Sequence, residues 1–324
     1  MRRREFITLL GGAAATWPIG AWAQQQPVVA FLNSATLDLS AERLAQFRKG
    51  LEETGFIEAQ NITIQYRSAE GYDERLPALA ADLVRNQVTL IATGSTAAAL
   101  AVKAATATIP VVFSTGADPV EVGLVASMNR PGGNLTGVSF LVNKLVPKRL
   151  ALLSTLTPGA SPIGILVDPA NPNTEADTKD AQSAAHAIGR TLLVVKSGTE
   201  REVALAFAVL VQQRVSALFV GAHANLTNWR DEIIAQAARH KITASYPSRE
   251  YVAAGGLMSY GPDQNDVYRQ VGIYAGRILR GEKPAELPVM QSTKFDFVLN
   301  LKTAKALGLS IPPTLLALTD EVIE

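Results

Sequence analysis

VTLIATGST, residues 88–96, is the stretch of this chain that most clearly indicates its fold. Residues 88–92 form a mostly apolar run that predicts a buried strand, and residues 95–105 predict the helix that follows it. Gly94 between them allows a tight turn. Strand, tight turn and helix in this order are the repeating unit of a doubly wound α/β sheet.

The same unit recurs on both sides of this segment. Further strands are predicted at residues 28–32, 62–66 and 110–113, with helices after Ser40, at 76–84 and at 120–128. The chain turns at residues 131–134, and the alternation then restarts. The second series has strands at 163–167, 192–195, 217–220 and 243–246, and helices at 148–156, 174–188, 200–212 and 228–240. The chain therefore predicts two Rossmann-like α/β lobes with parallel sheets.

Two similar lobes in series suggest a hinged clamp that closes on a ligand by rotation about short connections. Ligands of open parallel sheets bind beyond the carboxyl ends of the strands. In a clamp of two such lobes, these ends face each other across the cleft. We therefore expect the ligand-binding residues in the loops that follow the strands.

The first lobe offers hydroxyl, glycine and carboxylate candidates in these loops. They are Ser34, Gly94, Ser95, Thr96, Thr115 and Asp118. Ser95 and Thr96 open a helix, whose N-terminus suits a carboxylate, although Ser95 could simply cap its helix. Asp118 could receive a ligand ammonium group, or it could cap the segment that follows it.

The second lobe contributes two asparagines and two tyrosines. They are Asn171, Asn225, Tyr246 and Tyr260. Tyr246 could stack on a ligand, or it could belong to a packed turn. Tyr260 lies in a strand bracketed by glycines at residues 255–261, where it would be either a hinge residue or a wall of the cleft.

The first 23 residues predict export. Three arginines at positions 2–4 precede an apolar run at residues 7–22, and Ala21-Trp22-Ala23 provides a cleavage site. The arginines favour the twin-arginine route over the ordinary Sec route. We expect a periplasmic protein that begins at Gln24 and, with no cysteine in the chain, has neither a disulfide nor a lipoprotein anchor. No later run reaches about 18 apolar residues, so we expect no membrane anchor.

Composition and motifs exclude several classes of function. Removing the signal leaves 301 residues with 27 basic and 28 acidic side chains, since three of the 30 basic and one of the 29 acidic residues lie within it. This balance provides no strong field for nucleic acid. The histidines, His186, His223 and His240, show no metal-ligand spacing, and the standard nucleophile, zinc and nucleotide motifs are missing. We expect neither a catalytic residue nor a metal or cofactor.

Several segments resemble a known family. They are IPVVF at 109–113, DPV at 118–120, NRPGGNLTG at 129–137, AGGLMSYGP at 254–262, KFDFVLNLKTAKALGL at 294–309, IPPTLL at 311–316 and DEVIE at 320–324. The tail is the most specific of these. Together they resemble the solute-binding proteins of ABC transporters, in particular the tryptophan-binding-protein-like family with a type I periplasmic-binding fold.

This resemblance implies three crossovers between discontinuous lobes. Residues 24–140 with about 264–289 would form the first lobe, and residues 141–263 with about 290–324 the second. It also implies a small-molecule ligand, with an amino acid or aromatic acid favoured, and delivery to a permease driven by an ATPase. A monomer would suit that docking. Two other readings are a sensor that presents its closed form to a receptor kinase, and an enzyme, which would need an activated partner for His223 or Asp118.

Overall fold

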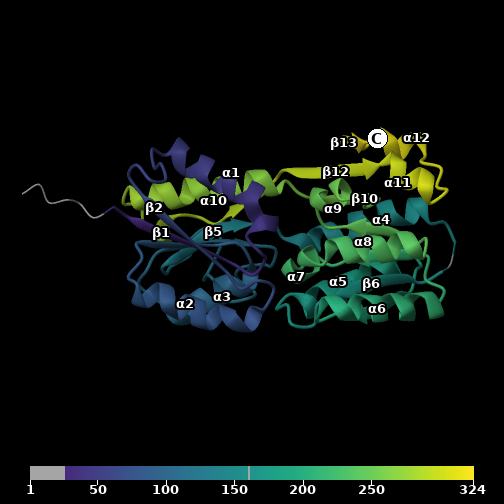
Figure 1. Cartoon of the computed structure of the whole chain (residues 1–324), viewed down its shortest axis with the longest axis horizontal. Coiled ribbons are helices and arrows are strands. Elements are labelled where there is room, and N and C mark those ends of the chain that lie inside the picture. Colours follow the sequence, from purple (N-terminus) through teal and green to yellow (C-terminus); the bar gives the residue numbers. More distant parts are fainter. Residues whose placement is uncertain (1–25, 160) are drawn as a thin grey trace, which may run out of the picture.

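The computed structural model describes residues 26–159 and 161–324, which form two α/β lobes side by side (Figure 1). The expected export signal at residues 1–23, its twin arginines, its cleavage site and the start at Gln24 lie outside the described residues. Within the described ranges, no helix is long and apolar enough to cross a membrane.

The first lobe is built on a six-stranded parallel sheet with the order β11-β5-β4-β3-β1-β2. Its strands are β1 (Val28–Asn33), β2 (Thr63–Ser68), β3 (Leu90–Thr93), β4 (Val111–Thr115), β5 (Leu135–Ser139) and β11 (Met290–Gln291). The central strands are buried along their length, which explains their nearly continuous apolar sequences.

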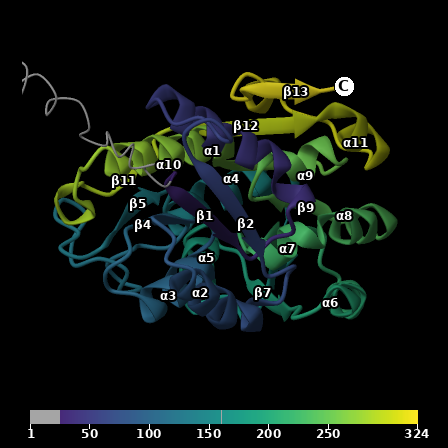
Figure 2. The ribbon, with the colours of Figure 1, turned by 60° about the vertical axis from the view of Figure 1, so that its left-hand side comes forward.

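Helices cover both faces of this sheet (Figure 1, Figure 2). On one face lie α1 (Ala41–Glu53) and α10 (Gln264–Leu279), and on the other α2 (Leu76–Arg85) and α3 (Thr96–Ala105). The first pair packs backbone to backbone, because a Cβ on Gly272 would lie 2.1 Å from the carbonyl oxygen of Phe47. Glycine at this crossing lets α10, distant in sequence, join the core of the first lobe.

The second lobe has a seven-stranded sheet with the order β13-β12-β10-β9-β8-β6-β7. Its strands are β6 (Ile163–Val167), β7 (Leu192–Lys196), β8 (Ala217–Val220), β9 (Thr243–Tyr246), β10 (Met258–Pro262), β12 (Phe295–Asn300) and β13 (Glu321–Ile323). The sheet is not wholly parallel as expected, because β12 runs antiparallel to β10. This reversal follows from the route of the chain, which enters β12 from the first lobe.

The helices of the second lobe also cover both faces of its sheet. They are α4 (Val146–Leu156), α5 (Thr174–Ala187), α6 (Glu200–Gln212), α7 (Ala224–Asn228), α8 (Arg230–Arg239), α9 (Arg249–Ala253), α11 (Leu301–Ala306) and α12 (Pro313–Leu316). One core layer draws on α4 and α5, and the opposite layer on α6 and α8.

The chain passes three times between the lobes. It leaves the first sheet after β5, returns between β10 and α10, and leaves again after β11. Met290 and Gln291 still pair with β5, and the backbone N–H of Ser292 donates to the Ser139 carbonyl at 2.9 Å. The last passage therefore comes a few residues after position 290.

Two predicted helices differ from the structure. Residues 120–128, expected to be helical, form a series of turns, because Gly123 has a φ of +71° and the N–H of Ala126 donates to the carbonyl of Pro131. The helix expected at 228–240 is broken at Trp229 into α7 and α8, and α7 occupies a stretch that had been read as a loop. Both changes lie near the carboxyl ends of strands, where loop conformation is decided by tertiary contacts.

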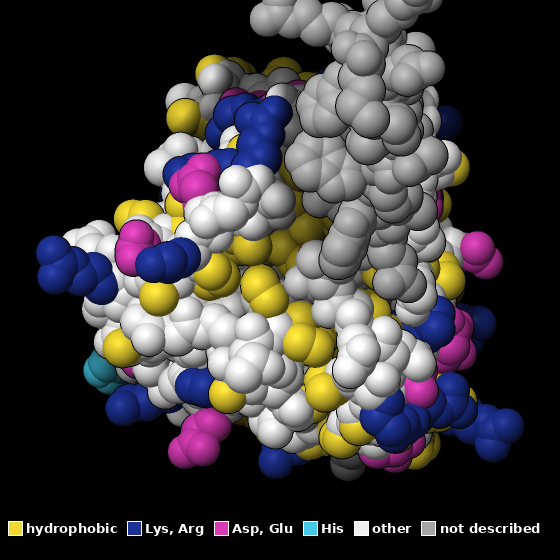
Figure 3. Space-filling model, turned by 90° about the vertical axis from the view of Figure 1, so that its left-hand side faces the viewer, with side chains coloured by type: hydrophobic (Ala, Val, Ile, Leu, Met, Phe, Trp, Pro, Cys, Tyr) yellow, Lys and Arg dark blue, Asp and Glu magenta, His cyan; other side chains and the backbone are white. Residues whose placement is uncertain are grey.

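Charges are mixed on the outer surface. Figure 3 shows the end of the first lobe that faces away from the second, and its described part carries Lys and Arg side chains interspersed with Asp and Glu. This face has no single electrostatic sign, which agrees with the nearly balanced composition.

Candidate functional site

A cavity lies between the two lobes, at the carboxyl ends of both sheets. In each sheet the strand order reverses beside the first strand of the lobe, between β1 and β3 and between β6 and β8. Ligands of open α/β sheets bind at such reversals. The loops after these four strands all line the cavity, which encloses about 690 Å³ including its opening to solvent.

The N-terminus of α3 forms one wall of the cavity. Ser95 is the N-cap, and its Oγ accepts a hydrogen bond from the N–H of Ala98 at 3.2 Å. The same oxygen lies 2.8 Å from the Oγ of Ser34, which follows β1. Ser95 therefore both caps the helix and lines the cavity, so its two predicted roles are compatible. The N–H groups of Thr96 and Ala97 belong to the first turn, where they suit a carboxylate.

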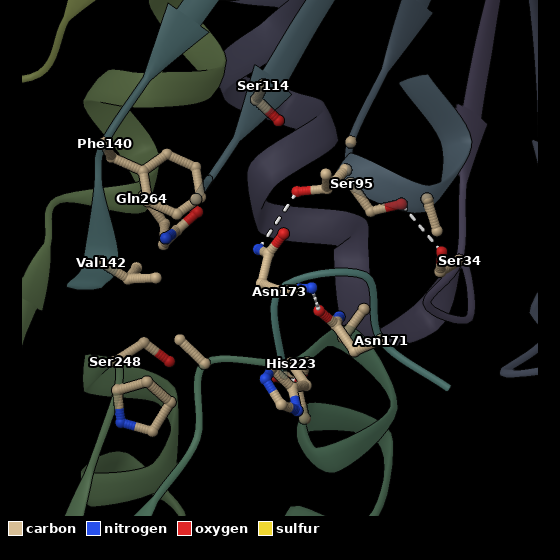
Figure 4. Close-up of a pocket in the computed structure, with 18 of the residues that line it drawn as sticks. Ser34, Ser95, Ser114, Phe140, Val142, Asn171, Asn173, His223, Ser248 and Gln264 are labelled. Carbon is tan, nitrogen blue, oxygen red and sulfur yellow. Dashed lines mark hydrogen bonds between the residues drawn. The ribbon is translucent and has the colours of Figure 1, made fainter. Parts of the chain in front are cut away.

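Asn173 reaches from the second lobe toward α3 (Figure 4). Its Nδ2 donates to the Oγ1 of Thr96 at 3.4 Å, and Thr96 in turn lies 2.8 Å from the Oγ1 of Thr115. Thr115 is fully buried and stands behind Thr96 rather than on the cavity wall. The backbone N–H of Asn173 donates to the Oδ1 of Asn171, which also lines the cavity.

His223 lines the floor of the cavity, but both of its ring nitrogens are engaged. The backbone N–H of Asp168 donates to Nδ1 at 3.0 Å, which places the ring proton on Nε2. Nε2 then donates to Oδ2 of Asp177 at 3.3 Å. The sequence had suggested no carboxylate partner for this histidine. Because no ring nitrogen is left to take a proton from a substrate, the pair positions the loop after β6 rather than forming a general base.

Arg43 and Glu250 close one side of the cavity. Arg43 lies on α1 of the first lobe and Glu250 on α9 of the second, and Nη2 is 2.7 Å from Oε1. Ser248, in the loop after β9, donates to Oε2 of Glu250 at 2.5 Å. Burial alone would raise the pKa of Glu250, but the Arg43 guanidinium holds it below its ordinary value.

The side of the cavity away from Ser34 and Asn171 carries apolar groups. Figure 4 shows Phe140 and Val142 on the side away from Ser34 and Asn171, with Gln264 beside them. Pro247 and Pro262 also line the cavity. The cavity thus has a hydroxyl- and amide-rich end and an apolar end, as a small amphiphilic molecule would require.

The lobes are in contact around the cavity. Besides the Arg43–Glu250 ion pair and the Asn173–Thr96 bond, the N–H of Thr36 in the first lobe donates to Oδ1 of Asn228 in the second at 3.4 Å. Each of these contacts joins groups from opposite lobes. The structure is therefore a closed clamp.

Five of the ten predicted site residues line the cavity: Ser34, Gly94, Ser95, Thr96 and Asn171. Asp118 lies outside the lining, and its Oδ1 accepts hydrogen bonds from the N–H groups of Val120 and Glu121 at 2.8 and 3.3 Å. We therefore leave it out of the proposed site.

The predicted tyrosines and Asn225 also lie outside the lining. Tyr246 is buried in the second lobe, where its ring stacks on Tyr251 at 5.0 Å. Tyr260 stacks on Phe295 across β10 and β12. Asn225 is buried beneath the cavity, and its Nδ2 donates to Oδ2 of Asp168 at 2.9 Å. Residues nearby in sequence line the cavity instead: Pro247 just past β9, Pro262 at the end of β10, and Ala222 and His223 before α7.

Sequence reasoning missed several lining residues. Among them are Arg43, Asp73, Ser114, Phe140, Thr227 and Gln264. Arg43 lies within a helix and Asp73 in a short turn, so neither directly follows a strand. Gln264 carried a usable signal, because it follows the glycine-bracketed strand that was expected near a crossover.

Three comparisons place these features among known proteins. The family model described as ABC transporter substrate binding protein matches residues 28–323. The tyrosine-binding protein of Clostridioides difficile strain R20291 is 28% identical over 263 residues, which are 81% of this chain and 75% of that protein.

Two solved structures are also similar. An ABC domain from Streptococcus pneumonia in complex with L-Trp has a TM-score of 0.84 and 26% identity, and the match covers 92% of this chain and 100% of that one. A ligand-free, open structure of a substrate binding protein with adhesive properties from Clostridium difficile has a TM-score of 0.66 and 25% identity, with 92% and 99% covered.

Proposed function

Because the chain belongs to the family of ABC transporter substrate binding proteins, we propose that it captures an amino acid or an aromatic acid between its lobes and delivers it to a permease. The family binds substrates and does not transform them, so the chain is not an enzyme. The resemblance to tryptophan-binding-like proteins, expected from the turn and tail motifs, is confirmed, as is the type I fold.

The observation that carries this proposal is the cavity itself. It lies where both sheets reverse their strand order, it has a helix N-terminus at one end, and an aromatic ring and a valine lie at the other. A carboxylate at the N-terminus of α3 and an apolar group near Phe140 would use both ends. The names of two relatives, which bind tyrosine and tryptophan, support this class of ligand.

The proposed mechanism is capture and closure. Ligand contacts to both lobes shift the equilibrium toward the closed form, because only that form presents both walls at once. The closed form then docks on the permease, whose cytoplasmic ATPase drives import. The higher TM-score with the L-Trp complex than with the ligand-free, open structure agrees with the closed arrangement described above. We further propose that the protein is exported to the periplasm and acts there as a soluble monomer.

A thermal-shift screen tests the proposal. The chain without its first 23 residues would be unfolded and refolded to remove carried ligand, then heated with amino acids, aromatic acids, purines, sugars or short peptides. A ligand at 100 times its Kd should add about 2.7 kcal/mol of stability. Stabilisation by amino acids or aromatic acids supports the proposal, whereas stabilisation by sugars or purines alone contradicts it. Size-exclusion chromatography with light scattering checks the monomer.

A further inference from the structure

Asp73 lines the cavity, and no Lys or Arg of residues 26–159 and 161–324 forms an ion pair with it. It begins the short turn Asp73–Arg75 after β2, and its Oδ1 is shielded from solvent yet accepts no hydrogen bond within the described part of the chain. The other charged residue of the lining, Arg43, already pairs with Glu250. A shielded carboxylate oxygen without a donor is costly, so its retention in a binding cavity points to a donor that arrives with the ligand.

The second lobe contributes another unused acceptor to the same cavity. Asn173 is only 5% exposed, and its Oδ1 has no partner among the described residues, although its Nδ2 is bonded to Thr96. Figure 4 shows this side chain extending into the cavity toward α3. The two unused acceptors come from opposite lobes, and both residues line the same cavity.

The local charge also favours a cation. Burial raises the pKa of Asp73, and the Asp168 carboxylate of the second lobe raises it further, against the opposing effect of the Ser34 hydroxyl. No group of three or more His, Asp or Glu side chains in residues 26–159 and 161–324 is arranged to hold a metal ion. An organic cation is therefore the chemistry that suits this end of the cavity.

Ser34 connects Asp73 to the N-terminus of α3. Its Oγ is 2.8 Å from the Oγ of Ser95, and its hydroxyl interacts with the Asp73 carboxylate. A carboxylate-binding helix end and an unpaired acid are thus separated by one serine side chain. An α-amino acid carries its carboxylate and ammonium groups on one carbon atom, so it would present both groups to this side of the cavity.

We infer that Asp73 binds the ammonium group of the ligand while the N-terminus of α3 binds its carboxylate, so that the cavity selects α-amino acids over aromatic acids without an amine. This inference rests on the proposed function and narrows its ligand class. It assigns to Asp73 the role that the sequence had suggested for Asp118, and it directs the ligand side chain toward Phe140.

Matched ligand pairs test the inference on the unaltered protein by isothermal titration calorimetry. L-tryptophan would be compared with indole-3-propionate, and L-tyrosine with 3-(4-hydroxyphenyl)propionate, since each pair differs only in the amine. Any other amino acid that binds in the screen would be paired with its desamino acid. Loss of a charge-assisted hydrogen bond should weaken binding roughly 10- to 100-fold. Equal or tighter binding of the desamino acids would overturn the inference.

The variant Asp73→Asn assigns the effect to this carboxylate. In this variant, the Kd for the amino acid should rise roughly 10- to 100-fold, while the Kd for the desamino acid should change by no more than about threefold. Without ligand, the variant should melt at no lower a temperature than the unaltered protein, because an unpaired charge is removed. Glu74→Gln is the matched control, since Glu74 is the exposed neighbouring acid and lies outside the cavity lining. If Asp73→Asn lost affinity equally for the amino acid and the desamino acid, Asp73 would have only a structural role, and the inference would be overturned.

Failure of the inference can be told apart from failure of the proposed function. If the unaltered protein binds amino acids and Asp73→Asn binds them equally well, the function stands and the role of Asp73 is refuted. If only acids without an amine bind, the inference again fails while capture of an organic solute stands. If neither member of any pair binds, both are refuted.

Discussion

Arg43 in α1 and Glu250 in α9 form an ion pair that joins the two lobes, with 2.7 Å between Nη2 and Oε1. Their side chains are 14% and 26% exposed, so the pair is screened less than a surface ion pair would be. The guanidinium also lies 5.7 Å from the centre of the Tyr268 ring, a contact within the first lobe that does not involve the second. Closure of the lobes thus brings the carboxylate of Glu250 to the guanidinium of Arg43.

Replacing Glu250 with glutamine should weaken ligand binding. The closed form would lose about 1–2 kcal/mol, because Arg43 keeps its position without a counter-charge, and Kd should rise roughly 5- to 30-fold. Glu321→Gln is the matched control, since it removes an ion pair of 2.6 Å with Arg249 that lies entirely within the second lobe. Calorimetry with an amino acid that binds in the screen measures both. Equal affinities for the two variants would contradict the assigned role in closure.

The effect of Glu250 should depend on pH in a definite direction. Its pKa in the closed form lies below the ordinary value of 4.5, so the open form binds the proton more readily. The ion pair therefore favours closure fully above about pH 4.5 and loses this effect as the pH falls through the lowered pKa. As the pH falls below about 4.5, the ratio of the Kd of Glu250→Gln to the Kd of the unaltered protein should therefore approach one. A ratio independent of pH would contradict the ionised pair.

Ser95→Ala should lower both stability and affinity. The cap bond to Ala98 is worth about 1 kcal/mol, and loss of the cavity hydroxyl should raise Kd by roughly two- to tenfold. Asn300→Ala is a suitable control, because Asn300 caps α11 through the N–H of Thr303 and lies outside the cavity lining. Thermal melts and calorimetry should show a similar loss of stability in both variants, with a loss of affinity in Ser95→Ala alone.

Asp118→Ala should lower stability while leaving the Kd unchanged. Its carboxylate accepts the backbone N–H groups of Val120 and Glu121, and loss of such a local cap costs about 1 kcal/mol. Calorimetry and thermal melts on the same preparation separate the two effects. A large loss of affinity with an unchanged melting temperature would instead restore Asp118 as the ammonium partner.

Gly94→Ala should damage the wall of the cavity. A Cβ at this position would lie 2.8 Å from Oη of Tyr268 and 2.9 Å from Cγ of Asn33, so both side chains or the backbone of Gly94 must shift. Overpacking of this kind costs about 1–3 kcal/mol. Gly133→Ala is the control, because its Cβ would meet nothing within 4 Å. If both variants melt at the same temperature, the close packing of Gly94 is not what maintains this wall.

How far the sequence could predict the site depends on where each residue stands relative to a strand end. Tyr246 is the last residue of β9, so its side chain points to a face of the sheet and is buried, whereas Pro247 and Ser248 just beyond it line the cavity. At the end of β4, the last strand residue, Thr115, is likewise buried, whereas Gly116 just beyond it lines the cavity. Residues just past a strand, such as Ser34 and Ser95, could therefore be predicted to line the cleft.

The two α/β lobes could be predicted from the sequence, because apolar strand runs and the spacing of apolar residues in helices are local patterns. The family could be predicted from the turn and tail motifs, which are also local. The tertiary structure alone decided that Arg43 meets Glu250 and that Asp73 stands beside Ser34 in the cavity. Arg43 and Glu250 lie on helices and Asp73 lies in a short turn, so none of these three directly follows a strand. Their meeting depends on how α1 packs on its sheet and how closely the lobes approach, and neither can be read from local sequence.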